Sequence, residues 1–423
     1  MAITISKEPS GIYPAYNDAY LVFTSDEPNQ TRGEIVITNL SSQVFSVNAD
    51  PDGNYMFNLK EIVMSLINTN GFKDADNSYP AGFGVTYPYG YVELDVDLQV
   101  VHALGTDSDT THLYEFIRGQ KQIGESVYSN LAQLLNYSDD GINYYLSYWE
   151  GFPFSFELQR MANLDDIEIA NNNTGESNAN GAEVTAGSFV ASTRYRIKTI
   201  GTTDFTLIGA ASNTVGLIFT ASGVGSGTGD AYTYTPFIAS ADGSYRVFMD
   251  KVSSNFTTDG ILPVPDVENL LEIYLNDTFA TNLYIKKMPI PRGVYLKWYN
   301  ADGGYSYFLF ERFFKETLQG KTIGVVGSNS FDNVGSIVAP TLSLGKEGRQ
   351  SYRLKTTVDA NEANIIRSLF TSPSVQMWTS QEAYVAGQWV DVEVKSGLSL
   401  NNKKSLNDMI VNIELPNLIT ARL

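Results

Sequence analysis

The feature that most constrains this fold is the alternation of apolar and polar residues at every second position. Such spacing places one face of a strand in a core and the other in solvent. Four segments show it, between stretches rich in Gly, Asn, Asp and Pro: EIVITN (34–39), YVELDVDLQVV (91–101), GVYLKW (293–298) and WVDVEVK (389–395). Helical spacing is confined to 58–68, 129–135 and 359–370, where Asp359 is placed to cap the last helix. The sequence therefore predicts a mainly β protein with a few short helices.

Composition favours several folded domains and excludes some partners. With 423 residues the chain exceeds what one hydrophobic core usually organises, and 26 Tyr and 22 Phe supply apolar surface for more than one. The net charge is −19 and no basic run occurs, which argues against nucleic acid as a partner. The absence of cysteine excludes disulfides, thiolate metal sites and a Cys nucleophile. Residues 1–10 do not resemble a signal peptide and no apolar run reaches the ~20 residues of a membrane helix, so we expect neither classical export nor membrane insertion.

One turn motif occurs three times and indicates a duplication. The form Asp-Gly-small-Tyr, followed by a strand, begins at Asp52, Asp242 and Asp302. In such turns Gly supplies a positive φ and Asp bonds its own backbone, which is typical of hairpins. An alternating strand and a Trp-bearing strand follow the first two copies in the same order. We therefore expect tandem β-sandwich-like domains at 1–170 and 236–335, the second a possible duplicate of the first.

Two further units differ from these domains in composition. Small polar stretches at 171–178 and 223–229 (GVGSGTG) are typical of flexible connections, and the segment between them is rich in Thr, Ser, Ile and Val. GVGSGTG lacks the Gly-Lys-Ser/Thr ending of a phosphate loop. We expect a small inserted β module at 181–235, because surface loops accept insertions at little cost. Residues 340–423 predict a C-terminal β-rich domain with a helix near 359–370.

Several of these stretches resemble bacteriophage virion proteins. GSFVASTRYRIKTIGTTDFTLIGAASNTVGLIFTASGVGSGTG looks like a small β module that recurs, often as an insertion, in virion proteins of environmental phages. The C-terminal succession of a helix, SPSVQMW and the hairpin WVDVEV resembles the closing segment of distal-tail and baseplate-hub proteins. ITISKEPSGIYPAYND resembles tail-associated proteins of phages that infect Bacteroidetes. The chain departs from the distal-tail pattern in lacking a recognisable N-terminal ring-forming domain.

The resemblance implies a structural virion protein of the phage tail and not an enzyme. It implies a homo-oligomer at the distal tail or baseplate, and the distal-tail resemblance implies a hexameric ring or adaptor. The expected partners are the tail tube and the tail-tip or hub proteins, with assembly in the host cytoplasm. One alternative is a peripheral receptor- or carbohydrate-binding tail protein, with the inserted module contacting host surface glycan. A head-decoration or head-fibre protein is another. No cofactor is implied.

Residue types that support catalysis are scarce. The chain has two histidines, His102 and His112, and no GxSxG or HExxH motif accompanies them, so we expect exposed hairpin histidines and no Ser-His triad. The pairs in DVD (95–97) and DVE (391–393) each share one strand face, as solvent-facing rows of an amphipathic strand do. Glycoside hydrolysis needs one carboxyl held protonated in a cleft, which such rows do not indicate. We therefore assign no catalytic or cofactor-binding residues.

One segment has the ligand spacing of a calcium loop. Asp50, Asp52 and Asn54 are followed by Glu61 in the twelfth place, as in an EF-hand. The sixth place, which that loop fills with Gly, is Tyr55. We expect a plain turn and assign no metal site, with calcium binding by Asp50 and Asp52 as the alternative.

Tyrosine clusters offer either core packing or a contact surface. They occur at 13–16, 87–91 and 144–149, and YPYGY (87–91) is the set expected to be most exposed. Tyr and Trp bury much area at low entropic cost, so the exposed members are suited to stacking on sugars or to a protein interface.

Overall fold

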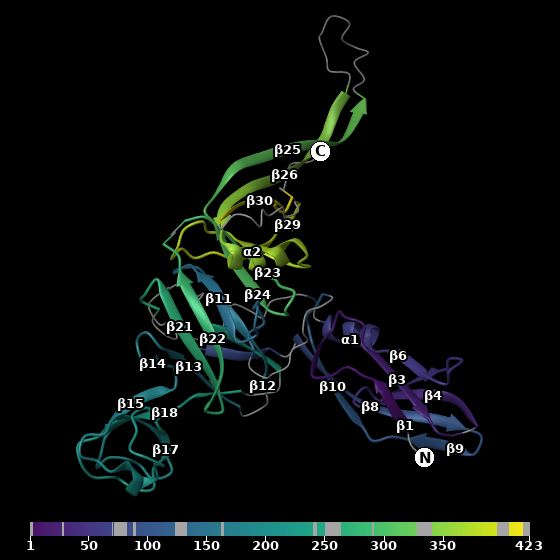
Figure 1. The fold of residues 1–423 in the computed structure, drawn as a ribbon. Helices are drawn as coiled ribbons and strands as arrows, with labels where there is room; N and C mark the ends of the chain where they lie inside the picture. The colour runs from purple at the N-terminus through teal and green to yellow at the C-terminus, as the bar shows by residue number, and fades with distance from the viewer. Residues whose placement is uncertain are drawn as a thin grey trace, which may run out of the picture.

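The chain folds into three bodies, each with its own main hydrophobic core, and a long β arm that projects from one of them (Figure 1). The computed structural model describes residues 3–27, 29–69, 71, 83–87, 90–122, 133–161, 165–239, 243–249, 264–289, 292–327, 341–395 and 406–417. Strands hold 54% of the residues and helices 7%, which confirms the multi-domain, mainly β class. No helix in the described ranges is both long and apolar enough to cross a membrane.

The N-terminal domain holds one core between a three-stranded and a six-stranded sheet. Its elements are β1 (Ile3–Lys7), β2 (Ile12–Pro14), β3 (Tyr20–Ser25), β4 (Gln30–Ile37), β5 (Gln43–Val47), β6 (Tyr55–Asn58), α1 (Lys60–Ile67), β8 (Tyr91–His102), β9 (Gly105–Ser108) and β10 (His112–Ile117). The sheet orders are β1-β3-β6 and β2-β10-β8-β4-β5, with β9 paired to β8. Helix α1 buries Val63 and Ile67 in the same core. The alternation expected over 34–39 and 91–101 thus forms two neighbouring strands, β4 and β8.

The central body contains the largest core, into which Trp149, Trp298 and Trp378 are buried. One sheet runs β11 (Asn143–Tyr148), β22 (Thr278–Lys287), β21 (Glu268–Leu275), β13 (Asp166–Asn171) and β14 (Glu176–Ser177), with β19 (Phe237–Ile238) beside β13. A second runs β12 (Ser155–Met161), β20 (Gly243–Phe248) and β7 (Phe83–Tyr87). A third runs β24 (Tyr305–Phe310), β23 (Val294–Tyr299), β27 (Val375–Trp378) and β28 (Trp389–Asp391).

The inserted module is a separate four-stranded sheet with an aromatic core. Its elements are β15 (Asn180–Thr185), β16 (Arg194–Thr199), the 3₁₀ helix η2 (Phe205–Ile208), β17 (Ile218–Thr220) and β18 (Asp230–Tyr234). The rings of Phe189, Tyr195, Phe205 and Phe219 pack against one another. This sheet lies where the sequence predicts the insertion, at 181–235.

The last sheet combines the projecting arm with the C-terminal strands. It runs β25 (Arg312–Gly327), β26 (Thr341–Val358), β30 (Asn407–Glu414) and β29 (Glu393–Val394). Helix α2 (Ala360–Arg367) and the 3₁₀ turn η3 (Ser368–Phe370) follow β26. The predicted cap is confirmed: Asp359 accepts the Glu362 N–H and Glu362 accepts the Asp359 N–H, which satisfies two otherwise unpaired donors.

The expected domain boundaries need correction, because strand pairing crosses them. β11, β12 and β13 pair with β22, β20 and β21, so 143–171 belongs to the central body and not to a domain ending at residue 170. Residues 340–423 share the central core as well, since Leu354, Ile366 and Met409 are members of it. The reason is that segments distant in sequence supply complementary apolar faces, and a boundary read from composition does not register them.

The expected duplication is also corrected. The Asp52 turn joins β5 to β6, which lie in different sheets, whereas the Asp302 turn closes the hairpin β23–β24. Asp242 lies outside the described residues. Strands from the first expected copy complete the sheets of the second, so the ranges 1–170 and 236–335 are not two independent copies of one domain.

Three local predictions also differ from the structure. In the expected helix at 129–135, residues 129–132 lie outside the described ranges, and Leu134 forms a bridge with Leu158 in place of a helical turn. The expected connection at 171–178 is an ordered turn between β13 and β14. GVGSGTG lies inside the module, where a Cβ on Gly229 would meet the Ile200 carbonyl oxygen at 2.5 Å. Its glycines therefore permit close packing of the backbone and do not form a linker.

Candidate functional site

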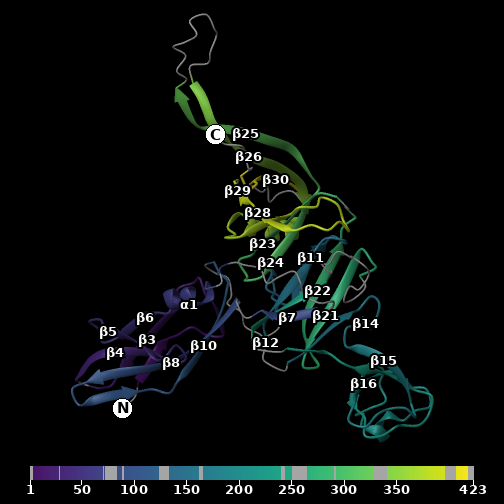
Figure 2. The ribbon, with the colours of Figure 1, turned by 180° about the vertical axis from the view of Figure 1, so that it is seen from behind.

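The arm formed by β25 and β26 is the most prominent candidate for contact with other molecules. It extends well beyond the central body in both side views (Figures 1 and 2). β30 pairs with β26 only over 351–358, and the described chain after it makes its last contacts with Gln350 and Glu347. Beyond the Gly320 and Gly348 pair the arm is a ribbon of two strands. A two-stranded ribbon is marginally stable in water by itself and presents unpaired backbone groups along both edges.

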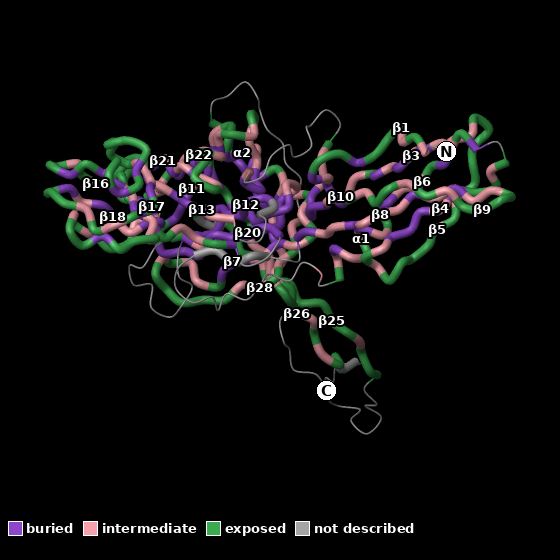
Figure 3. Tube along the Cα trace, turned by 90° about the horizontal axis from the view of Figure 1, so that it is seen from below, coloured by how far each residue is buried: buried purple, intermediate pink, exposed green. Residues whose placement is uncertain are grey.

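Apolar side chains lie exposed along this ribbon. Leu318 is 66% and Val325 60% exposed, and exposed and half-buried residues predominate along the arm in Figure 3. The exposed apolar residues of the arm are Leu318, Ile323, Val325, Val326 and Leu344. A row of this kind is typical of a surface that a partner covers.

The arm is also basic in an otherwise acidic chain. Residues 312–355 contain seven Lys and Arg and three Asp and Glu, a net charge of +4. Since the whole chain carries −19, the remaining residues carry −23. The arm is therefore complementary in charge to the rest of the protein.

The third Asp-Gly motif attaches the N-terminal domain to the central body. The Gln120 N–H donates to the Ala301 carbonyl at 2.8 Å, and Lys121 Nζ lies 2.6 Å from Asp302 Oδ1. The Tyr299 hydroxyl donates to the Arg118 carbonyl at 2.5 Å. A Cβ on Gly303 would lie 2.3 Å from that same carbonyl oxygen. From sequence this motif was only a hairpin turn, because nothing local shows that a second domain packs against it.

A network of charges and one ring anchors the inserted module. Arg196 pairs with the buried Glu168 of β13, and the guanidinium groups of Arg194 and Arg196 lie 4.6 and 4.9 Å from the centre of the Tyr234 ring. The Tyr234 hydroxyl donates to Glu168 and to Asp277. Burial, and then the charge of Glu168, raise the pKa of Tyr234, so the hydroxyl stays a donor. The module is thus held by specific contacts as well as by its two chain connections.

Arg196→Met is expected to loosen the module. It leaves the buried Glu168 carboxylate without its main cationic partner, at a cost of roughly 1–3 kcal/mol. Differential scanning calorimetry should then show the thermal unfolding of the module as a transition separate from that of the central body. The control is Lys198→Met, which removes an exposed pair with Glu183 and should leave the profile unchanged. Equal effects of the two substitutions would contradict this account of the junction.

Within the part of the chain that it describes, the structure adds no further ligands to Asp50 and Asp52, the residues considered for calcium binding. One oxygen of Asp50 accepts the N–H groups of Asp52 and Asn54 at 2.9 and 2.8 Å. Hydrogen bonds from the side chain and backbone of Asn54 hold the pKa of Asp50 below its usual value. Among the described residues, Asp50, Asp52 and Glu61 do not form a three-ligand group. The Asp50 carboxylate thus caps the backbone of the turn at 50–54.

The other residues considered from sequence are dispersed. His112 hydrogen-bonds Asp109 at 3.2 Å. In the cluster 144–149, Tyr144, Tyr148 and Trp149 are buried, whereas Tyr145 is half exposed and stacks on Tyr284 at 4.8 Å. Of YPYGY, residues 88 and 89 lie outside the described ranges. Asp391 and Glu393 are exposed, but the expected single strand over 389–395 is wrong: Asp391 ends β28 and Glu393 begins β29, which lie in different sheets.

A small hollow lies beside the exposed Tyr145. It measures about 170 Å³ and is bordered by Tyr137, Asp140 and Asn143 among others. Ligand pockets are usually about 300–1,000 Å³. Hydrogen bonds from the backbone and side chain of Asn143 lower the pKa of Asp140, the opposite of what a general acid requires. This hollow does not have the properties of a glycosidase cleft.

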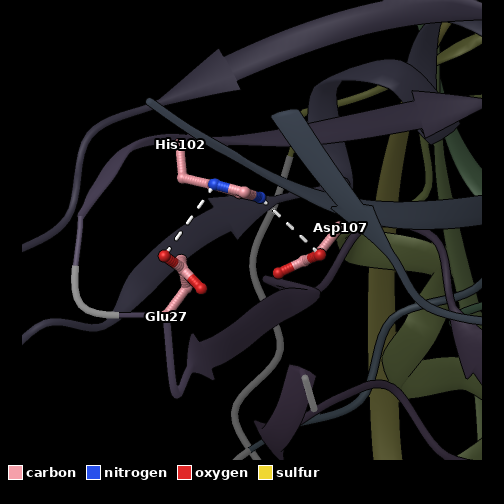
Figure 4. Close-up of side chains that lie close together, drawn as sticks. All are labelled: Glu27, His102 and Asp107. Carbon is pink, nitrogen blue, oxygen red and sulfur yellow. Dashed lines mark ion pairs between the residues drawn. The ribbon is translucent and has the colours of Figure 1, made fainter. Parts of the chain in front are cut away.

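His102 lies between two carboxylates, an arrangement that the sequence did not indicate. Nδ1 is 3.8 Å from Glu27 Oε1 and Nε2 is 3.7 Å from Asp107 Oδ1 (Figure 4). His102 and Glu27 are buried, so the prediction of an exposed histidine is wrong here. Glu27 follows β3 and is 75 positions away in the chain, beyond the reach of any local motif.

Comparisons with known proteins leave the family open. Neither a protein-family profile nor a curated protein matches this chain. A solved structure titled "Streptococcus agalactiae AgI/II polypeptide BspA C terminal domain (WT)" is similar over 67% of this chain and 99% of its own, with 8% identity and a TM-score of 0.12. One of native E. coli alpha-2-macroglobulin is similar over 100% of this chain and 31% of its own, with 8% identity and a TM-score of 0.18. Scores this low carry no argument about fold or function.

Proposed function

We propose that this protein is a structural component of a bacteriophage tail that assembles by contacts between copies of itself. The observation that carries the proposal is the β25–β26 arm, a ribbon with exposed apolar residues and, among the residues that the structure describes, no third strand beyond Gly320 and Gly348. Such a ribbon becomes stable when a partner covers its apolar side chains or pairs with its edge. The sequence resemblance supplies the phage tail as the setting.

The occupant proposed for the arm is a second copy of this chain. The arm carries +4 and the remaining residues −23, so a neighbouring copy attracts it electrostatically. The N-terminal domain, the module and the arm leave the central body in different directions (Figure 1), which leaves the arm accessible to a neighbour. Repeated contacts of this head-to-tail kind close into a ring when the rotation between copies allows it.

Native mass spectrometry of an arm-deleted chain tests the proposal. Gly320 and Gly348 are cross-strand partners, so an Asn-Gly turn can replace residues 321–347 without disturbing the inner arm. The intact chain should form an oligomer and the shortened chain a monomer with an unchanged melting temperature. A matched control removes the module at 181–235 and should keep the oligomer. An intact chain that stays monomeric, or an arm-deleted chain that still assembles, would overturn the proposal.

Charge reversal gives a milder version of the same test. Lys321→Glu with Lys346→Glu should weaken self-association about tenfold or more, because it changes the net charge of residues 321–347 from 0 to −4, which an acidic neighbour repels. Lys198→Glu on the module is the control and should have no effect. Since screening shortens to about 3 Å at 1 M salt, high salt should reduce the difference between the two variants.

A further inference from the structure

Glu27, His102 and Asp107 lie close together at the β8–β9 hairpin of the N-terminal domain; Glu27 is buried, and the other two are partly buried (Figure 4). His102 ends β8, Asp107 lies in β9, and the two strands form a hairpin in which His102 pairs with Gly105. Glu27 comes from the segment after β3. One ligand atom from each of the three side chains lies within 4.8 Å of the other two.

The carboxylates of Glu27 and Asp107 lack hydrogen bonds that burial normally requires, whereas His102 accepts one from the Leu104 N–H. The side chain of Glu27 is 6% exposed and that of His102 8%. The contact of Glu27 with His102, at 3.8 Å, is too long for a hydrogen bond, and no described residue donates one to the Glu27 carboxylate. Asp107 Oδ2 is buried and has no hydrogen-bond partner among the described residues. Buried carboxylates in this state are costly unless a cation compensates them.

We propose that Glu27, His102 and Asp107 bind one divalent transition-metal ion, with Zn²⁺ or Mn²⁺ as the chemical class. An imidazole nitrogen with two carboxylate oxygens suits these ions better than Ca²⁺ or Mg²⁺, which take oxygen ligands. Two carboxylates also neutralise the charge of the ion. The inference concerns a different part of the chain from the arm and goes beyond the proposed tail function.

The spacing of the group is wider than that of a filled site. Metal–ligand bonds of about 2.0–2.2 Å place neighbouring ligand atoms about 3.0–3.6 Å apart. The contacts of 3.8 and 3.7 Å involve different nitrogens of His102, Nδ1 with Glu27 and Nε2 with Asp107, so an ion bound at one nitrogen uses only one of them. The ligand atoms of the group lie within 4.8 Å of one another, so binding all three side chains needs a movement of up to about 1–2 Å. Nδ1 also accepts the Leu104 N–H at 3.3 Å, a long bond in an exposed turn that an ion at this nitrogen displaces. Binding would fasten the β8–β9 hairpin to the segment after β3.

Titration calorimetry of the chelator-treated full chain tests the site. Zn²⁺ should bind with one equivalent per chain, and Ca²⁺ and Mg²⁺ at least tenfold more weakly. His102→Gln, Glu27→Gln and Asp107→Asn should each weaken Zn²⁺ binding tenfold or more. The matched control is His112→Gln, which removes the histidine of the neighbouring His112–Asp109 pair and should leave the affinity unchanged.

Two results would overturn the proposal. One is the absence of saturable Zn²⁺ or Mn²⁺ binding by the intact chain, and the other is equal Zn²⁺ affinity of the His102→Gln and intact chains. Co²⁺ added to the intact chain provides a measurement that needs no variant: ligation by imidazole and carboxylate should change its visible absorption, and equimolar Zn²⁺ should abolish that change. A Co²⁺ spectrum identical to that of the aqueous ion would contradict the site even if the variants failed to fold.

Discussion

Arg246→Met is expected to destabilise the central body by about 3–5 kcal/mol, the cost of leaving one partner of a buried ion pair alone. Arg246 Nε lies 3.0 Å from Glu157 Oε1, and the two side chains are 3% and 4% exposed. The guanidinium also donates to Ser155 and Tyr307 at 2.9 and 2.7 Å. Replacing it leaves the Glu157 carboxylate in a low-dielectric environment, where water does not compensate its charge.

Denaturant unfolding followed by tryptophan fluorescence measures this effect, since Trp149 and Trp298 report on the same core. The double variant Arg246→Met with Glu157→Met should regain much of the lost stability, because two apolar side chains leave no buried charge. Arg292→Met removes an exposed pair with Glu382 and should change stability little. If Arg246→Met lowered the free energy of unfolding no more than Arg292→Met, the Arg246–Glu157 pair would not contribute to the stability of the central body.

Gly303→Val is expected to loosen the packing of the N-terminal domain against the central body, to which β7 still ties it through β20, while both cores remain folded. The φ of Gly303 is +96°, which costs a residue with a Cβ roughly 1–2 kcal/mol. The larger effect is steric, since the new Cβ would lie 2.3 Å from the Arg118 carbonyl oxygen. The contacts on either side, of Gln120 with Ala301 and Lys121 with Asp302, should then be lost together.

Hydrogen exchange and small-angle scattering test this prediction. The Gln120 amide should lose its protection and the radius of gyration should rise, with an unchanged far-UV circular dichroism spectrum. Gly53→Val is the matched control: Gly53 lies in the first Asp-Gly motif at φ +85°, and a Cβ there meets nothing within 4 Å. It carries the same backbone strain without the collision. Equal behaviour of the two variants would assign the effect to strain alone and contradict the proposed role of the third motif.

Local patterns in the sequence were sufficient for the class and for many single elements. Alternation identified β4, β8 and β23, and the Asp359 cap located the start of α2, because hydrophobic period and capping depend on neighbouring residues. The strands of the inserted module also followed from patterning, whereas the two stretches expected from composition to be its flexible connections are ordered parts of the fold. These features need no knowledge of what lies across the core.

Strand partners and candidate sites depend on contacts between distant residues, which a local pattern does not encode. β11 pairs with β22 although 139 positions separate the paired residues, and an alternating strand is compatible with any sheet that offers a complementary face. The Asp302 motif forms an interface only because Arg118 packs against it. His102 lies near Glu27 only because β4 pairs with β8 and the turn before β4 brings Glu27 close. The sequence alone thus established the strands and caps. The pairing of the strands, the domain limits, the isolated arm and the Glu27–His102–Asp107 group arise from tertiary packing. The reason is that the burial of apolar faces selects one among many arrangements that are equivalent locally.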